Sequence, residues 1–333
     1  MHLRAISSAF PSEYVATETV AQWVGMDPAF IINKVGIAGR FFMSSQETVL
    51  TLSKTACDNL FASNPDLRPD AVKLLIVVTQ NPDYKLPHTS ALLQHALGLA
   101  TDVACFDISL GCSGYVYALS IAKSFMLAEG INEALVVTSD PYSKIIGKKD
   151  RDTVTIFGDA ATATWMSLGG SGVLGKMDWG TDGARAHTLM VPAGGSAHPV
   201  SSVWNANQTV QPSDDFRLKM DGRAIFNFMM EKVPQSVNAC LEKNDTTLDA
   251  VDYFVFHQAN RFFLDQLQKK MGLPAAKVPC NVHEVGNTVS SSIPLLLSRL
   301  LQEGKLRNRS VLVSGFGVGL SWATNLIFFG GAL

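Results

Sequence analysis

Short segments made almost entirely of β-branched and other apolar residues constrain this chain most. The clearest is VKLLIVVT at 72–79, and four more occupy 103–109, 134–139, 251–256 and 311–314. Strands that are apolar at every position are covered on both faces, as in a parallel sheet flanked by helices. Longer segments with helical periodicity separate them, at 47–62, 113–128, 222–242, 261–271 and 289–303. The pattern predicts an α/β fold with a largely parallel sheet.

The two halves of the chain repeat one another in order and spacing. LLIVVTQN at 74–81 is matched by DYFVFHQA at 252–259, and LVVTS at 135–139 is matched by VLVSG at 311–315. A third match pairs segment 103–110, GCS and a helix with segment 278–285, GNT and a helix. All three matches share an offset of about 175 residues, which indicates duplication. We therefore predict two related halves, 1–170 and 171–333.

The composition limits the classes of partner. Charged residues make up 17% of the chain and hydrophobic residues 47%, against about 25% and 45–50% in typical soluble domains. So few charges exclude a disordered chain and indicate a large core with a buried subunit interface. The formal net charge is −2. Bulk electrostatics therefore does not attract the protein to nucleic acid or to an anionic membrane, and neither is an expected partner.

The cysteines and the chain ends indicate the compartment. Five cysteines with no C-x-x-C pair make neither a disulfide framework nor a zinc site, and they fit a reducing environment. The N-terminus has no apolar stretch long enough for a signal peptide. Residues 310–333 carry no charge, but glycines interrupt them, so we expect two buried strands joined by a loop rather than a membrane span. These features predict a cytoplasmic protein.

Three chemically capable residues follow predicted strands. Cys112 opens a predicted helix, whose N-terminal dipole favours a thiolate over a thiol. His257 ends a strand, and Asn287 lies in the GNT turn. Taken singly, Cys112 fits a buried inert thiol as well as a nucleophile, while His257 fits a core histidine and Asn287 a turn residue better than a catalytic group. Ligands of open α/β sheets bind at the carboxyl ends of strands, and the duplication gives Cys112 and Asn287 equivalent helix starts. We therefore predict that the three share one crevice.

Other apparent motifs do not fit their chemistry. Segment 170–176 matches G-x-x-x-x-G-K, but Met177 stands where a P-loop has Ser or Thr. Segment 315–319 lacks the last glycine of a dinucleotide-binding fingerprint. His283 and Glu284 have no second histidine in register for zinc. No metal site and no cofactor are expected.

Five motifs in this order resemble the β-ketoacyl-acyl-carrier-protein synthase III family of the thiolase superfamily. They are GCSGY around Cys112, FGDAA beginning with Phe157, HQAN at 257–260, GNTVSSSIP at 286–294 and GFGVGLSW at 315–322. The resemblance covers essentially the whole chain. It implies a thiolase-like duplicated, five-layered αβαβα fold, a homodimer, and acyl-CoA and acyl carrier protein as substrates and partners.

The resemblance implies a role for each residue of the predicted crevice. Cys112 would accept the acyl group, and His257 and Asn287 would promote decarboxylation of a malonyl thioester. Backbone N–H groups of Cys112 and Val318 would form the oxyanion hole. The implied activity is a decarboxylating Claisen condensation that proceeds through an acyl-cysteine and gives a 3-oxoacyl product.

The resemblance also implies binding positions outside the reacting groups. Leu86, in the loop after the 72–79 strand, would close the acyl pocket of the partner subunit, and its size favours acyl groups of four to six carbons over acetyl. Arg261, Lys269 and Lys270 would dock the carrier protein. The positions for CoA and the thioester arm are Phe30, Lys34, Arg151, Phe157, Met220, Phe226, Ala259, Asn260 and Phe316.

Several of these positions depart from the family pattern. Phe30 stands where a tryptophan is common, Asp152 replaces a glycine after Arg151, and Phe262 replaces an arginine. The departures leave the donor carrier, CoA or protein, open and favour a specialised pathway over fatty-acid initiation. Two alternatives also stay open: acyl transfer to an amine or hydroxyl, and a non-catalytic subunit that binds the carrier.

Overall fold

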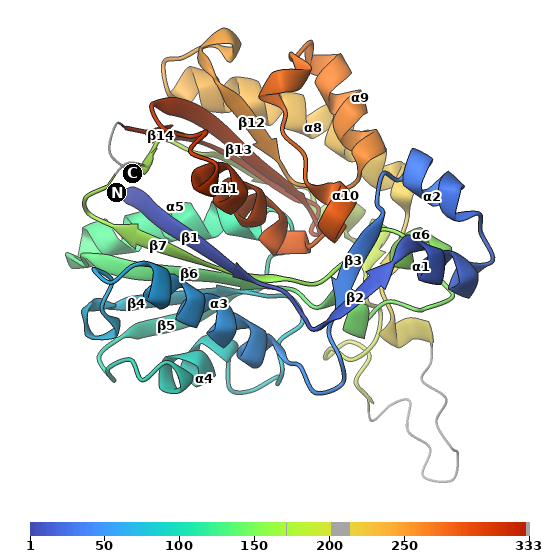
Figure 1. Ribbon diagram of the computed structural model, residues 1–333, viewed down its shortest axis with the longest axis horizontal. Helices are drawn as coiled ribbons and strands as arrows, with labels where there is room; N and C mark the ends of the chain where they lie inside the picture. The colour runs from blue at the N-terminus through green and yellow to red at the C-terminus, as the bar shows by residue number, and fades with distance from the viewer. Residues whose placement is uncertain (171, 201–213, 331–333) are drawn as a thin grey trace.

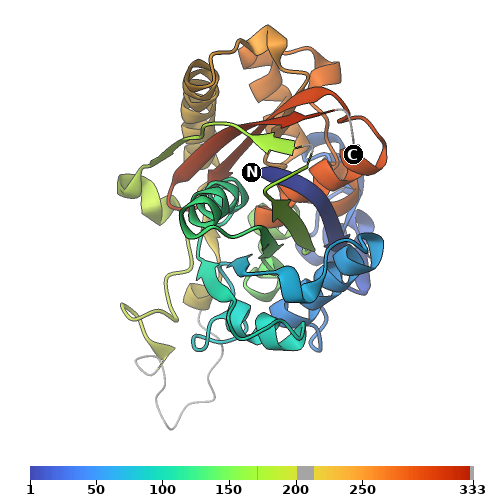
Figure 2. The ribbon, with the colours of Figure 1, turned by 90° about the vertical axis from the view of Figure 1, so that its left-hand side faces the viewer.

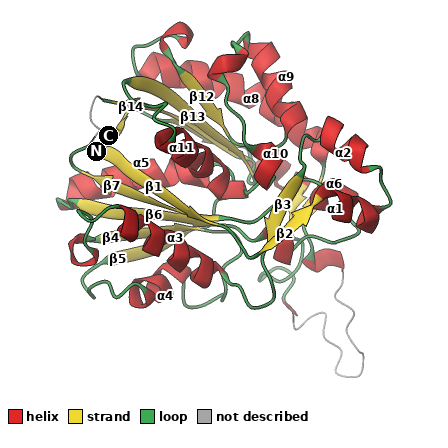
Figure 3. Cartoon of the chain, in the orientation of Figure 1, coloured by secondary structure: helices red, strands yellow, loops and turns green. Residues whose placement is uncertain are grey.

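The computed structural model describes residues 1–170, 172–200 and 214–330. Figure 3 shows strands packed between helices. The strands of the first half are β1 (His2–Ala9), β2 (Glu13–Ala16), β3 (Gly39–Phe42), β4 (Leu74–Val78), β5 (Ala104–Ile108), β6 (Glu133–Ser139) and β7 (Ala161–Ser167). Those of the second half are β8 (Gly172–Leu174), β9 (Asp178–Thr181), β10 (Leu189–Met190), β11 (Lys219–Met220), β12 (Tyr253–Phe256), β13 (Arg309–Gly317) and β14 (Ser321–Phe329).

The five predicted helices lie close to their predicted positions, and the other helices were not predicted. The helices of the first half are α1 (Thr17–Val24), α2 (Pro28–Lys34), α3 (Val49–Ser63), α4 (Thr89–Ala96), α5 (Gly114–Glu129) and α6 (Arg151–Val154). Those of the second half are α8 (Gly222–Lys243), α9 (Arg261–Met271), α10 (Val282–Val285) and α11 (Ser292–Gln302). The predicted five are α3, α5, α8, α9 and α11. A short 3₁₀ turn, Val289–Ser291, precedes α11, which therefore begins three residues later than its pattern predicted.

The main sheet is mixed, so the prediction of a largely parallel sheet is wrong. Its strand order is β12-β13-β14-β8-β1-β7-β6-β4-β5, with β9 beside β14. Only β4–β5, β4–β6 and β12–β13 are parallel pairs. β1, β7, β8 and β14 pair antiparallel and join the two halves. Complete burial of β4 and of most of β6 and β13 reflects cover on both faces, which a mixed sheet receives as well as a parallel one.

Helices and strands form five layers, as the resemblance implied. α5 and α11 lie in the middle, with β4 and β6 on one side and β12, β13 and β14 on the other (Figure 1). α3 and α4 cover the outer face of the first group, and α8 covers β13 and β14 (Figure 1). Figure 2 shows α5 nearly end-on between the two groups of strands. Leu119 of α5, Leu297 of α11 and Val313 of β13 belong to one fully buried core.

Two of the three repeats match in the structure. In each half a parallel pair, β4–β6 or β12–β13, is followed by an antiparallel strand, β7 or β14. The third match fails, because 278–285 is no strand and its last residues form the helix α10, which Gly286 ends with a φ of 69°. Ser171, at the predicted boundary, lies outside the described residues.

The uncharged C-terminal segment forms the two expected strands. β13 and β14 pair antiparallel from Arg309–Phe329 to Gly317–Ser321. Among the described residues, no helix combines the length and the hydropathy needed to cross a membrane.

Candidate active site

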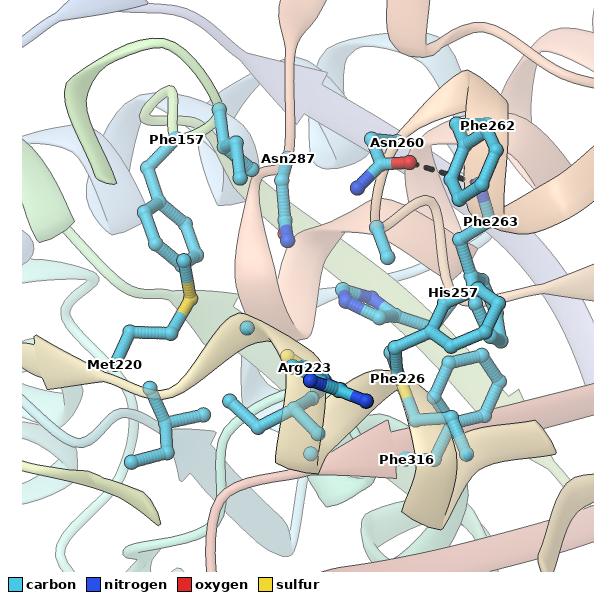
Figure 4. A pocket seen from close by; sticks show the side chains of 18 of the residues that line it. Phe157, Met220, Arg223, Phe226, His257, Asn260, Phe262, Phe263, Asn287 and Phe316 are labelled. Atoms are coloured by element: carbon cyan, nitrogen blue, oxygen red, sulfur yellow. Dashed lines mark hydrogen bonds between the residues drawn. The ribbon is translucent and has the colours of Figure 1, made fainter. Parts of the chain in front are cut away.

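A cavity of about 350 Å³ lies where the two halves meet. Its outer part is lined by exposed residues, including Arg223 and Phe262, and its inner part by buried ones, including Tyr142 and Phe157. Figure 4 shows the labelled side chains around this space. Nine predicted site residues line it: Cys112, Phe157, Met220, Phe226, His257, Ala259, Asn260, Asn287 and Phe316.

Cys112 lies between β5 and α5, one residue before the N-cap Ser113. Close backbone approaches fix its place. A Cβ at Gly317 would lie 3.0 Å from the Cys112 Sγ, and a Cβ at Gly111 would lie 2.3 Å from Oε1 of Gln80. The hydroxyls of Ser113 and Ser321 share a hydrogen bond of 2.7 Å, which joins the loop around Cys112 to the start of β14.

The resting thiol is not the thiolate that the helix dipole suggested. The Cys112 side chain is only 6% exposed, and burial raises its pKa, with a smaller contribution from the Asp140 carboxylate. Desolvation disfavours the charged form more strongly than one helix turn favours it. The correction follows from burial, which position at a helix start does not reveal.

His257 directly follows β12, and its N–H extends the strand ladder to the Ser314 carbonyl at 2.8 Å. Burial lowers the pKa of its imidazole to about 3, so the ring is neutral at physiological pH. Nδ1 lies 2.7 Å from Oγ of Ser292, whose oxygen also accepts the Gln258 N–H. Among the described residues this hydroxyl has no acceptor other than Nδ1, so it donates there. The ring proton is therefore on Nε2, and the ring lines the cavity.

Asn287 is held by backbone pairing rather than by a strand end. Its N–H donates to the Ile156 carbonyl (2.9 Å), and its carbonyl accepts from the Gly158 N–H (3.0 Å). Its side-chain Oδ1 accepts the Val289 N–H at 2.9 Å. Val289 has a φ of 53°, a strained conformation for a β-branched residue. With Oδ1 engaged, the amide NH₂ is the group that faces the cavity (Figure 4).

A buried carboxylate supports the inner end of the cavity. Asp140 accepts hydrogen bonds from the Gln80 N–H (2.7 Å) and the Ser290 hydroxyl, and burial raises its pKa to about 6. The Tyr142 hydroxyl donates to Oε1 of Gln80 at 2.8 Å. The Tyr142 and Phe157 rings pack 4.9 Å apart. The inner wall of the cavity is therefore aromatic, and its Tyr142 side chain is held by a hydrogen bond and by ring packing.

The remaining predicted binding residues do not line the cavity. Phe30 is 51% exposed on α2, and Leu86 is 86% exposed between β4 and α4. Arg151 lies 3.7 Å from Asp152. Val318, predicted to contribute only its backbone N–H, is not among the lining residues, whereas its neighbour Gly317 packs directly against Cys112. The others outside the cavity are Lys34, Arg261, Lys269 and Lys270.

Sequence reasoning missed residues that only tertiary contact reveals. Ser292 lies within the motif GNTVSSSIP, yet nothing in the sequence distinguishes it from Ser290 or Ser291. Tyr142 and Arg223 lie in segments without a recognised motif. The offset between the two halves does not distinguish these residues from their neighbours. Other missed lining residues are Ile156, Leu189, Ile225, Met229 and Phe263.

The site combines one nucleophile with two neutral hydrogen-bond donors. An imidazole N–H and an amide NH₂ can stabilise a developing oxyanion without protonating a neighbouring carbanion. The Phe316 ring packs edge-on against His257, with centroids 5.5 Å apart, and keeps this region apolar. No cluster of His, Cys, Asp or Glu within the described residues could hold a metal ion. The arrangement is suited to thioester chemistry in a water-poor pocket.

Comparisons with protein families and curated proteins agree with this geometry. Residues 106–183 match the family model 3-oxoacyl-[acyl-carrier-protein] synthase III, and residues 241–328 match its C-terminal model. The chain is 33% identical over 320 residues to a β-ketoacyl-[acyl-carrier-protein] synthase III of Streptococcus mutans, covering 95% of each chain. It is also 33% identical over 323 residues to the enzyme of that name from Lactococcus lactis, again covering 95% of each.

Solved structures extend the likeness to three dimensions. A crystal structure of a 3-oxoacyl-(acyl-carrier-protein) synthase III has 36% identity and a TM-score of 0.92, covering 98% of this chain and 99% of that one. A synthase from Burkholderia xenovorans has 34% identity and a TM-score of 0.90, covering 99% and 94%. This chain therefore belongs to the 3-oxoacyl-[acyl-carrier-protein] synthase III family and is a condensing enzyme with its thiolase-like fold.

Proposed function

We propose that this enzyme condenses an acyl-CoA starter with malonyl-acyl-carrier protein by a decarboxylative Claisen reaction. The observation that carries the proposal is the orientation of the two donors. Ser292 directs the His257 proton to Nε2, and Val289 directs the Asn287 amide NH₂ into the cavity that contains Cys112. A site with two neutral donors stabilises an enolate, whereas transfer to an amine or hydroxyl needs a base.

The first half-reaction transfers the acyl group. The Cys112 sulfur attacks the thioester carbonyl, the C–S bond to CoA breaks, and the departing CoA thiolate takes the thiol proton. The N–H groups of Cys112 and Val318 stabilise the tetrahedral oxyanion in this proposal, each contributing ~3–4 kcal/mol. Because one thioester is exchanged for another, the step is close to isoenergetic. The thiolate is needed only during attack, when the Cys112 proton passes to the departing CoA sulfur.

The second half-reaction forms the carbon–carbon bond. Loss of CO₂ from the malonyl thioester leaves an electron pair that is delocalised onto the thioester oxygen as an enolate. His257 Nε2–H and the Asn287 NH₂ donate to that oxygen. The carbanion carbon attacks the acyl-Cys112 carbonyl, and the Cys112 thiolate leaves and takes a proton from solvent. The products are a 3-oxoacyl carrier protein, CoA and CO₂.

The substrate arms are proposed to enter from the exposed end of the cavity. Met220, Phe226, Ala259, Asn260 and Phe316 would flank the pantetheine arm, since they line the cavity. Phe30, Lys34 and Arg151 would contact the nucleotide end of CoA. The basic last turn of α9, with Lys269 and Lys270, and Arg261 at its start would meet the acidic carrier protein. No cofactor is required by this chemistry.

The proposed assembly is a homodimer in the cytoplasm. β5 is an edge strand of the main sheet, and its residues are half-buried rather than exposed, including the apolar Phe106 and Ile108. An edge of this kind suits pairing with the same strand of a second copy. The free cysteines support a reducing compartment.

Reconstitution with defined substrates tests the proposal. The protein is incubated with an acyl-CoA and malonyl-carrier protein, and CO₂ release and the mass of the carrier product are measured. We expect CO₂ and a 3-oxoacyl carrier in equal amounts. Acyl transfer to an added amine or alcohol without CO₂ release would instead support the acyltransferase alternative, and no reaction of any kind would support a non-catalytic subunit.

A further inference from the structure

Arg40 is a completely buried cation behind the active site. It lies in β3, and its side chain is 0% exposed. Burial lowers its pKa only to about 10, so it stays charged at neutral pH. Arginine is almost never fully buried unless it is paired, because desolvating the charge is costly. Among the described residues, no carboxylate lies within ion-pair distance of Arg40.

Backbone carbonyls and one hydroxyl take the place of a carboxylate. Nη2 donates to the Thr155 carbonyl at 3.1 Å and to Oγ1 of Thr17 at 3.3 Å, and Nη1 donates to the Val154 carbonyl at 3.4 Å. Nε is buried without a partner. The guanidinium group therefore hydrogen-bonds to the last residue of α6 and to the residue that follows it. The next residues in the chain are Ile156, Phe157 and Gly158.

The Arg40 stem packs against two glycines of the active-site loops. A Cβ at Gly158 would lie 2.9 Å from the Arg40 Cβ, and a Cβ at Gly286 would lie 3.4 Å from it. These glycines flank the bridge between Phe157 and Asn287. Arg40 thus touches both sides of the backbone pair that holds Asn287, without lining the cavity itself.

We propose that Arg40 is a positioning residue for Asn287. It fixes segment 154–158, whose Ile156 carbonyl and Gly158 N–H hold the Asn287 backbone, and so sets where the amide NH₂ meets the enolate oxygen. The inference rests on the proposed function, because it assigns Arg40 to the decarboxylation step. Cys112 lies on a different loop, after β5, and among the described residues no hydrogen bond joins it to segment 154–158.

The two half-reactions measured separately test the inference. Arg40→Met removes the charge and the fork at similar length, whereas Arg40→Lys keeps the charge on a single donor nitrogen without the planar fork. Acylation of Cys112 is followed by intact-protein mass after addition of acyl-CoA, and decarboxylation by CO₂ release from malonyl-carrier protein. We expect Arg40→Met to acylate within about threefold of wild type but to lose about 100-fold in decarboxylation, the effect of a misplaced group of ~1 Å. Arg40→Lys should recover part of that loss.

A control separates positioning from general damage. Leu60→Ala creates a cavity in a core cluster away from the site and should lower the thermal midpoint without changing the ratio of the two rates. Equal losses of acylation and decarboxylation in Arg40→Met, or no loss in either, would overturn the inference. If Arg40→Met does not fold, Thr17→Val removes one guanidinium partner, and the same selective loss is expected. Equal losses in that variant would also overturn it. Failure of wild-type acylation would reject the proposed function itself.

Discussion

At the scale of single residues, each donor of the site is oriented from the side away from the cavity. Ser292 occupies Nδ1 of His257, and the Val289 N–H occupies Oδ1 of Asn287. Both bonds are buried, where an unpaired partner is costly, so neither group can turn around cheaply. The site is preorganised to donate, and this arrangement separates enolate stabilisation from acid–base work.

Replacing either donor should impair decarboxylation but not acylation. We expect His257→Ala and Asn287→Ala to allow acylation of Cys112 but to raise the barrier to decarboxylation by ~2–4 kcal/mol, because both donors act on the enolate. Single-turnover mass spectrometry and CO₂ release measure the two steps. An acylation defect as large as the decarboxylation defect would require a different assignment of roles.

The neutral state of His257 has a consequence for stability. Its pKa is lowered from 6.5 in the unfolded chain to about 3 in the fold. Below pH 6.5 the unfolded chain therefore binds a proton that the folded protein does not, and stability is lost as the pH falls. His257→Asn should remove this loss. The quantity to compare is the unfolding free energy of His257→Asn minus that of wild type. This difference should be about 2 kcal/mol more positive at pH 5 than at pH 7.5.

Urea unfolding of both proteins at pH 7.5, 6 and 5 measures this difference directly. The comparison between two proteins removes the contribution of every other titrating group, including the buried Asp140. A difference that does not change with pH would mean that His257 titrates equally in both states.

At the scale of elements, the sequence located several buried strands and the five longest helical segments, but it did not predict the central strands β1 and β7 or how the strands pair. Continuous apolar segments located β4, β6, β12 and β13, because a strand that is buried on both faces is apolar at every position. These segments could not show whether paired strands run parallel or antiparallel, because a strand covered on both faces has the same apolar sequence pattern in either case. The GNT segment misled for a similar reason. The valines of segment 278–285, which precedes it, fit a strand. In the structure this segment ends in α10, and Asn287 pairs with Phe157, which is far away in the sequence.

The loop between β4 and α4 is expected to influence the choice of acyl group. Leu86 projects from it with 86% exposure, outside the cavity of its own chain. In a homodimer it would close the partner's acyl pocket, where leucine leaves more room than phenylalanine. Each buried CH₂ contributes ~0.8 kcal/mol, so acyl groups of about four to six carbons should outcompete acetyl.

Relative kcat/KM values for acetyl-, butyryl-, hexanoyl- and octanoyl-CoA test this prediction. Leu86→Phe should shift the ranking toward acetyl. If wild type prefers acetyl and Leu86→Phe leaves the ranking unchanged, the rigid wall of Tyr142 and Phe157 sets the limit instead.

At the scale of the whole molecule, the low charge content of the chain predicts a buried subunit interface. The half-buried edge strand β5 is the matching structural feature. Phe106 of β5 packs 6.0 Å from Phe125 of α5, so the edge carries an apolar cluster on one face. The proposed position of such an interface at β5 could not be inferred from composition, because composition does not reveal which strand ends a sheet.

Disrupting this edge should yield monomers. We expect Phe106→Lys to halve the mass in sedimentation equilibrium, because a charge at an apolar interface is desolvated without a partner. Phe328→Lys, at an exposed position of β14, is the matched control and should leave the mass unchanged. A wild-type protein that is monomeric at micromolar concentration would contradict the proposed dimer.

The central claim, a condensation through an acyl-Cys112 intermediate, is tested most directly by a two-step mass measurement. Wild type and Cys112→Ser are first treated with butyryl-CoA, freed of excess reagent, and then mixed with malonyl-carrier protein. We predict one butyryl adduct on wild type, located at Cys112 by peptide mapping, and none on the variant. The adduct should disappear on the second addition, with release of equimolar CO₂ and a 3-oxohexanoyl carrier. An adduct on another cysteine, or an adduct that persists while CO₂ is released, would contradict the account.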